Sequence, residues 1–179
     1  MTNAELAILT MIAEKPRHGY VIEQVIEERG MREWTEVGFS SIYYLLKKLE
    51  KEGLIEGRME RQPSRGPARV VYKLTSTGKQ AAQAGVLQVL SVPKRSYPPI
   101  LLGIANLPGI SRGQALNALQ TYRDGLISRR EDVQMSRDSQ RPLPCFVEAM
   151  FSYSITMIEA ERTWVEEFIE QLEAGDVES

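Results

Sequence analysis

Apolar residues recur along most of the chain at intervals of three and four positions, the spacing of one face of an α-helix. This pattern predicts helices at about residues 4–13, 20–29 and 40–52, and another that begins near Thr75 and ends near residue 90. Two longer helices are predicted at about residues 111–133 and 146–172. We therefore expect a mainly α-helical protein.

Two short segments interrupt the helical pattern. Residues 54–60 and 69–74 are predicted as strands, the second because Val70, Val71 and Tyr72 favour extended backbone. The segment between them holds a glycine, two prolines and charged residues, and is predicted as a loop. Three short helices followed by a two-stranded β wing is the element order of a winged helix-turn-helix.

Three prolines between Ser91 and Pro99 break the pattern again. They predict a boundary between an N-terminal winged helix-turn-helix domain of residues 1–90 and a C-terminal helical domain of residues 91–179. The expected fold class is thus mainly α, with a winged helix-turn-helix followed by a helical domain.

Positive charge is concentrated in one part of the chain. The net charge is −2, but residues 39–79 hold nine Lys and Arg against four Asp and Glu, whereas the chain from residue 81 onward holds nine against thirteen. Because attraction to phosphate depends on local charge, this basic segment is compatible with nucleic-acid binding in an acidic protein.

The predicted helix at 40–52 has the features of a DNA-recognition helix. Such a helix enters the major groove by its N-terminus, with small polar side chains near the bases and cations near phosphates. Ser40, Ser41, Tyr43 and Tyr44 fit the first role, and the second fits Lys47 and Lys48. The wing at 61–69 could reach the adjacent minor groove through its arginines, which are Arg61, Arg65 and Arg69.

Other classes of protein are disfavoured by composition. No apolar run approaches the roughly 18 to 20 residues that a membrane span needs, and the N-terminus lacks a secretory signal pattern, so a cytoplasmic protein is expected. One cysteine and one histidine make a disulfide framework or a His/Cys metal site improbable. We expect no cofactor and no enzyme activity, because no strand after residue 80 is followed by a glycine-rich turn.

Three segments resemble the PadR-like transcriptional regulators: the triplet His18-Gly19-Tyr20, residues 40–55 (SSIYYLLKKLEKEGLI) and residues 72–79 (YKLTSTGK). The resemblance covers about residues 7–80. Residues 158–164 also resemble the last helix of the longer branch of the family, in which a C-terminal helical domain mediates dimerisation.

The resemblance implies a homodimeric repressor of a pseudo-palindromic operator, released by a small aromatic or lipophilic cationic effector. It places residues 40–47 on the recognition helix, and His18 and Tyr20 at the start of the helix that lies on the DNA backbone. The arginines at 61, 65 and 69 belong to its wing.

The sequence leaves two alternatives open, one for the last predicted helix and one for the function. The aromatic and methionine stripe of the last predicted helix is interpreted as a dimer seam in preference to an effector pocket; its members are Phe151, Met157, Trp164 and Phe168. An alternative function is a winged-helix dimer that contacts other proteins and binds no specific DNA.

Overall fold

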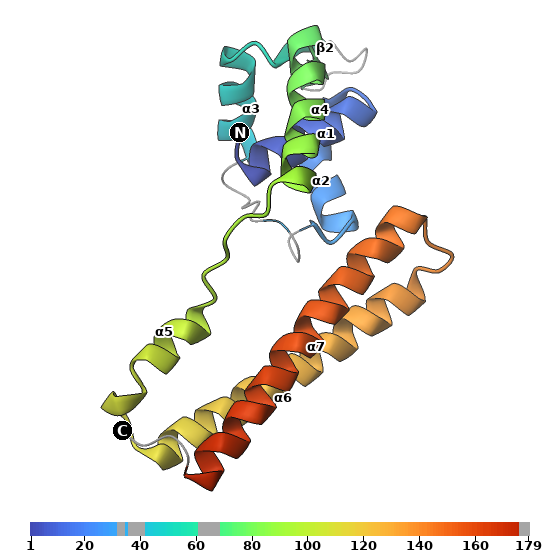
Figure 1. The fold of residues 1–179 in the computed structure, drawn as a ribbon. Coiled ribbons are helices and arrows are strands. Elements are labelled where there is room, and N and C mark those ends of the chain that lie inside the picture. The colour runs from blue at the N-terminus through green and yellow to red at the C-terminus, as the bar shows by residue number, and fades with distance from the viewer. Residues whose placement is uncertain (32–34, 36–41, 61–68, 176–179) are drawn as a thin grey trace. The chain divides into compact units, whose positions relative to one another are not determined.

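The computed structural model describes residues 1–31, 35, 42–60 and 69–175. The chain divides into two compact units, Met1–Arg95 and Ser96–Ser179, and each has a hydrophobic cluster of its own (Figure 1). None of the helices in these described ranges is long and apolar enough to cross a membrane.

The first unit contains four helices and three strands among its described residues. They are α1 (Asn3–Glu14), β1 (Arg17–His18), α2 (Gly19–Glu28), α3 (Ile42–Lys51), β2 (Ile55–Glu60), β3 (Arg69–Leu74) and α4 (Ser76–Ser91). The predicted winged helix-turn-helix is confirmed.

The core of the first unit forms where α1, α2 and α3 converge. Each helix has one apolar face, so that residues three and four positions apart point inward together. The side chains at its centre have no measurable exposure; they include Ile8, Leu9, Ile22, Ile26, Ile42, Leu46 and Leu49. Burial of this apolar surface is the main contribution to the stability of the unit.

Local capping explains where several helices begin. The Thr2 hydroxyl accepts a hydrogen bond from the Glu5 backbone N–H (3.2 Å), and the Glu5 carboxylate accepts one from the Thr2 N–H (2.7 Å), which is a complete capping box. The same arrangement joins Ser111 and Gln114 in the second unit. Gly30 and Gly53 follow α2 and α3 with φ values of 56° and 71°, which disfavour other residues.

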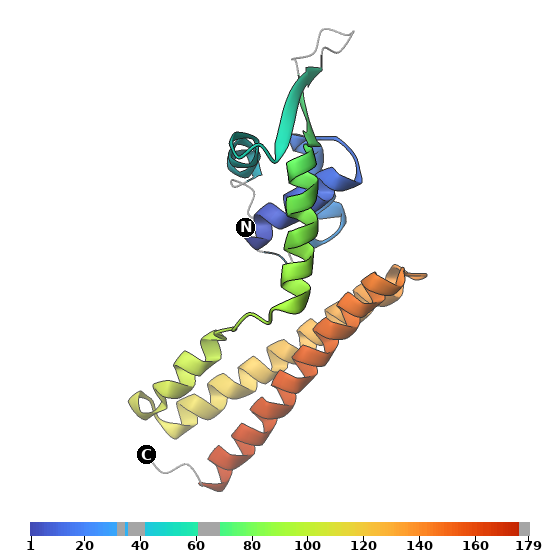
Figure 2. The ribbon, with the colours of Figure 1, turned by 45° about the horizontal axis from the view of Figure 1, so that its top comes forward.

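The sheet of the first unit is antiparallel, with strand order β1-β3-β2. In its register, Tyr72 of β3 lies opposite both Arg17 of β1 and Gly57 of β2. Figure 2 shows β2 and β3 side by side, extending away from the helices. Strand β1 was not predicted, because two residues are too few to show an alternating pattern.

The start of α4 is fastened to the turn between α3 and β2. The Thr75 hydroxyl donates to the Gly53 carbonyl at 2.7 Å, and the Thr75 backbone N–H donates to the Leu54 carbonyl at 3.1 Å. A Cβ at Gly78 would lie 1.8 Å from the Leu54 oxygen. Only a glycine allows the helix to approach this closely.

The second unit is built around two long helices. Its elements are α5 (Pro99–Ala105), a 3₁₀ turn at Leu107–Gly109, α6 (Arg112–Ser139) and α7 (Cys145–Ala174). Helices α6 and α7 lie side by side in Figures 1 and 2. They are antiparallel, because the Arg112 guanidinium donates to the Glu173 carbonyl while Arg137 contacts Glu148 at the other end.

Apolar and polar contacts alternate between α6 and α7. The apolar cluster repeats every seven residues, as in Leu119 and Leu126, or Ile158, Val165 and Leu172. Between these layers, Arg130 donates to Glu159 at 3.0 Å, and Tyr122 donates to Glu161 at 2.7 Å. Each exposed pair contributes little alone, but paired layers disfavour a shifted register.

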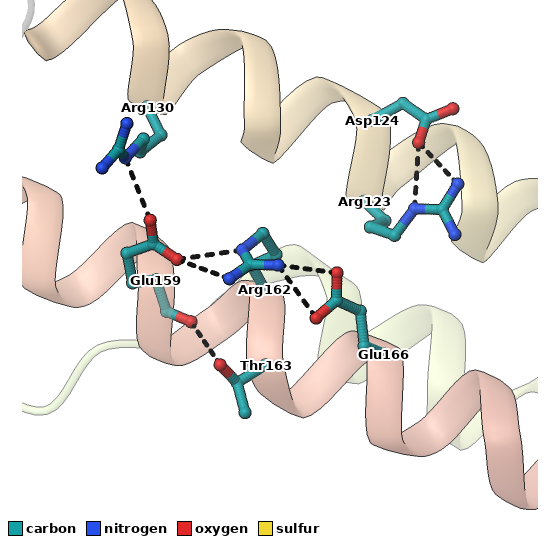
Figure 3. Close-up of polar contacts among 7 residues, drawn as sticks. All are labelled: Arg123, Asp124, Arg130, Glu159, Arg162, Thr163 and Glu166. Carbon is teal, nitrogen blue, oxygen red and sulfur yellow. Dashed lines mark hydrogen bonds and ion pairs between the residues drawn. The ribbon is translucent and has the colours of Figure 1, made fainter.

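Arg162 is the centre of the polar network on α7. It lies between Glu159 and Glu166 and donates to both carboxylates, at 2.9 and 2.8 Å (Figure 3). These contacts lower the pKa of Glu159, chiefly through the Arg162 hydrogen bond. Burial, together with the hydrogen bond to Glu161, raises the pKa of Tyr122 to about 12, so its hydroxyl stays a donor at neutral pH.

Candidate nucleic-acid interface

Helix α3 presents two contrasting faces. Its apolar residues are buried against the core; these are Ile42, Leu45, Leu46 and Leu49. Tyr43, Tyr44 and Lys47 point outward, and Tyr44 is 67% exposed. The predicted contacts Ser40 and Ser41 lie outside the described residues. The described part of the helix therefore offers two aromatic side chains and a cation to solvent.

A stacked column of side chains joins the start of α2 to the base of the wing. The His18 and Tyr20 rings are 5.4 Å apart and 18° from parallel. On the Tyr20 ring lies the Arg69 guanidinium, 4.8 Å from its centroid, and Arg69 also donates to the Tyr20 hydroxyl at 2.9 Å. Arg69 is thereby held in one orientation by a cation–π contact and a hydrogen bond.

His18 is fixed at the other end of the column. Its Nδ1 lies 3.1 Å from the Val70 carbonyl oxygen, which can only accept, so Nδ1 carries a proton. Its Nε2 lies 3.8 Å from the Glu60 carboxylate. The ring of His18, which ends β1 and caps α2, thus contacts both strands of the hairpin.

The column and the outer face of α3 are neighbours. A Cβ built on Gly19 would lie 2.9 Å from Cε1 of Tyr43. The Tyr43 ring therefore packs directly on the backbone between His18 and Tyr20. Side chains from α2, α3 and β3 form one continuous surface, which we call the His18–Tyr43–Arg69 surface.

Lys48 has a partner that sequence reasoning did not foresee. Its ammonium lies 2.5 Å from the Glu5 carboxylate of α1, and Glu5 is only 3% exposed. Burial alone raises the pKa of Glu5, but the Lys48 and Thr2 contacts outweigh it and lower the pKa below its usual value. Contact of Lys48 with DNA stays a prediction, whereas in this structure the residue joins α3 to α1.

Glu50 is a second residue that the sequence analysis missed. Its carboxylate accepts a hydrogen bond from the Gly57 backbone N–H at 2.9 Å, which ties α3 to β2. A Cβ at Gly57 would lie 2.7 Å from that carboxylate oxygen. A glycine inside a strand often marks a close approach of another group to the backbone, so Gly57 was the feature of the sequence from which this contact could have been predicted.

The candidate dimer or effector residues of α7 fall into two groups. Met157 and Trp164 are exposed, at 51% and 43%. Phe151 and Phe168 are half-buried, and Phe168 packs against the apolar cluster of the second unit and stacks on Trp164 with centroids 5.2 Å apart. The four residues thus do not share one environment.

Comparison with known proteins assigns the family. Residues 8–84 match the model of the "Transcriptional regulator PadR-like family". Residues 8–84 of this chain belong to the PadR-like family. The matched residues include α2, α3, the described parts of the hairpin and the start of α4, so the PadR-like region contains the whole His18–Tyr43–Arg69 surface.

Solved structures similar to this PadR-like chain extend over its second unit as well. Bacillus subtilis PadR in complex with operator DNA is 22% identical, with a TM-score of 0.76 over 94% of this chain and 98% of that one. Its complex with p-coumaric acid gives 21% identity and the same TM-score and coverage. The PadR-like regulator BC1756 from Bacillus cereus is 18% identical, with a TM-score of 0.64 over 94% of each chain.

At these identities the structural likeness shows a shared fold. No curated protein matches the sequence significantly. Within the described part of this PadR-like chain, no group of three or more His, Cys, Asp or Glu side chains is placed to hold a metal ion. Arg61 and Arg65 of the predicted wing lie outside the described residues, and Arg69 at its base is the wing arginine whose position is known.

Proposed function

We propose that this PadR-like transcriptional regulator binds specific DNA sites as a homodimer, through the recognition helix at 40–52 and the wing at 61–69. The observation that carries the proposal is the continuity of the His18–Tyr43–Arg69 surface. A cation, two stacked rings and the outer face of α3 meet there, with Lys47 one turn further along the helix.

The proposed roles follow from the place of each residue along the chain, in the recognition helix, at the start of α2 or in the wing. Ser40, Ser41, Tyr43 and Tyr44 are assigned to base edges, because the N-terminal part of a recognition helix enters the major groove. The residues assigned to the phosphate backbone are His18, Tyr20, Lys47, Lys48 and Arg69. Arg61 and Arg65 are assigned to the minor groove.

Dimerisation is proposed through α7. Its exposed apolar side chains are separated by four, three, four and seven residues, which is a heptad spacing; they are Phe146, Met150, Tyr153, Met157 and Trp164. A stripe of this kind is typical of a helix that packs against another helix. A two-fold dimer would present two recognition helices to half-sites about one helical turn apart.

Regulation by a ligand is the third part of the proposal. The related PadR of Bacillus subtilis is known in complex with operator DNA and with p-coumaric acid. For this chain we propose repression in the cytoplasm, relieved by a small aromatic or lipophilic cationic effector. An effector can shift DNA affinity only by binding the two conformations with different affinities.

Fluorescence anisotropy with labelled promoter DNA tests the proposal. We expect wild-type affinity to fall steeply with salt, because bound Lys and Arg release counterions from phosphate. Lys47→Glu should weaken binding about tenfold or more and reduce the slope of log affinity against log salt by about 1. Arg129→Glu, an exposed charge reversal in the second unit, should change neither quantity.

Two outcomes would contradict the proposal. Equal affinity for promoter DNA and a scrambled duplex would argue against specific regulation. A salt slope near zero, unchanged by Lys47→Glu, would favour the alternative of a winged-helix dimer that contacts other proteins.

A further inference from the structure

The first unit contains a hollow of about 380 Å³ beside Lys48 of α3 and the adjoining Glu52. Helices α1, α3 and α4 supply its walls, and its lining includes Glu5, Lys48, Leu49, Glu52, Ala84 and Gly85. All of these residues belong to one compact unit. The volume is that of a small-molecule site.

Small side chains on α4 create the space. Ala81 and Ala84 line the hollow, where larger residues would occupy it, and Gly85 allows Met1 to pack against α4. At Gly85 a Cβ would lie 2.2 Å from the terminal methyl group of Met1. The apolar part of the wall is completed by Leu54 and Ala81, which are half-buried.

The charges on the wall do not balance. Two carboxylates flank one ammonium: Lys48 Nζ is 2.5 Å from Glu5 and 3.8 Å from Glu52. Glu5 is buried yet ionised, because Lys48 and Thr2 lower its pKa despite the burial. Glu52 keeps nearly half of its side chain exposed, so its carboxylate is open to a further cation.

We propose that this hollow binds a small apolar molecule that carries one primary ammonium group. The ammonium takes the excess negative charge by donating to Glu52, beside Lys48. The hydrocarbon part lies on Leu54, Ala81 and Ala84 and leaves water, which supplies most of the binding free energy. The charge provides the selectivity for a cation over a neutral or anionic molecule of equal length.

The consequence for regulation rests on the proposed DNA-binding function. Lys48 and Leu49 of α3 and the adjoining Glu52 line the hollow, while Tyr43, Tyr44 and Lys47 of the same helix face outward. A ligand that contacts the inner side of α3 is coupled to DNA contacted by its outer side. The coupling must be reciprocal: amine changes the affinity for DNA, and DNA changes the affinity for amine by the same factor.

Isothermal titration calorimetry of the full chain with hexylammonium chloride tests the site. We expect saturable binding with one ligand per chain. The neutral 1-hexanol and the anionic hexanoate have the same hydrocarbon chain and serve as controls. Hexylammonium should bind about fivefold more tightly than 1-hexanol, which corresponds to one partly exposed ion pair, and hexanoate should bind most weakly.

Two variants locate the ligand. Ala84→Leu fills the hollow and should weaken hexylammonium binding at least tenfold, whereas the matched Gln83→Leu, on the adjacent exposed position of α4, should leave it unchanged. Glu52→Gln should remove the preference for the cation over 1-hexanol. Its control is Glu167→Gln in the second unit. Circular-dichroism melting of each variant shows whether it is folded.

The outcomes separate this inference from the proposed function. Absence of saturable binding, equal binding of the three ligands, or binding unaffected by Ala84→Leu would overturn the site, even if promoter DNA is bound as proposed. Amine binding without specific DNA binding would overturn the proposed function and leave the site standing. Unchanged DNA affinity in saturating hexylammonium would overturn the coupling alone.

Discussion

The first unit contains a fully enclosed core, whereas the second unit encloses very few side chains, although both units also carry exposed apolar residues. In the first unit, residues such as Ile22, Leu46 and Leu49 have no exposure. In the described part of the second unit, Val165 also has no exposure, while Leu119 and Ile169 of the same cluster are 6–7% exposed. Three converging helices enclose many side chains fully, whereas the α6–α7 pair does so at Val165.

This difference indicates that the units depend on partners to different degrees. The first unit forms an enclosed core by itself, although its α4 exposes Val86, Leu87 and Leu90. The second unit fills part of the α6–α7 contact with ion pairs and exposes Phe146, Tyr153 and Met157 on α7. Exposed apolar stripes of this kind mark interaction surfaces. The comparison supports a first unit whose core is complete by itself and, under the proposed dimerisation, a second unit that gains apolar contacts from a second copy.

The largest effect is expected from truncation of the enclosed core. Leu46→Ala removes a side chain with no exposure, and we expect a loss of about 3–4 kcal/mol in the free energy of unfolding. The matched Leu119→Ala in the second unit should cost about 2 kcal/mol, because a site near the surface can relax. Urea denaturation followed by circular dichroism measures both, and equal losses would show that the two cores are enclosed alike.

The next effect concerns the proposed dimer. Met157→Glu places a charge in the exposed stripe of α7 and should weaken self-association at least tenfold, since an unpaired charge would be desolvated in the interface. Analytical ultracentrifugation measures the change. Thr156→Glu, on the next residue but off the stripe, should behave like the wild type. A monomeric wild type, or equal effects of the two substitutions, would remove the basis for assigning this surface to a second copy.

A smaller effect is expected from the contact between α3 and the hairpin. Glu50→Ala removes the acceptor for the Gly57 N–H, so the angle between recognition helix and wing is less well fixed. DNA affinity should fall about fivefold, the equivalent of one hydrogen bond. Glu166→Ala, which breaks an ion pair on α7, is the control and should leave DNA affinity unchanged. If both variants bind DNA equally well, the contact between Glu50 and Gly57 does not position the recognition helix relative to the wing.

The smallest effect concerns acid. The pKa of Glu5 is lower in the folded protein than its usual value of 4.5, so its contribution to stability is complete above about pH 4.5 and is lost as pH falls through the folded pKa. Glu5→Gln should therefore lower Tm by about 3 °C at pH 7 and by less at acid pH. Thermal unfolding of the wild type and of Glu5→Gln between pH 7 and pH 3 measures the difference in Tm. A constant difference across that range would show that ionisation of Glu5 is not the cause.

The fold was predictable because its signals are local. The caps at Thr2 and Ser111 were visible as residue types at fixed spacing, and the inner face of α3 was visible as a helical repeat. The candidate site was less so. The contacts of Tyr20 with His18 and Arg69 depend on the pairing of strands far apart in the sequence. The ion pair between Lys48 and Glu5 depends on how α1 crosses α3.

The fastening of α4 to the end of α3 has a mechanical consequence. Gly78 allows α4 to rest on the Leu54 carbonyl, and Thr75 binds the same turn by two hydrogen bonds. The start of α4 is therefore held tightly against this turn. A rotation of α4 about its own axis would therefore also move Leu54, and only four residues separate the end of α4 at Ser91 from the start of the second unit at Ser96.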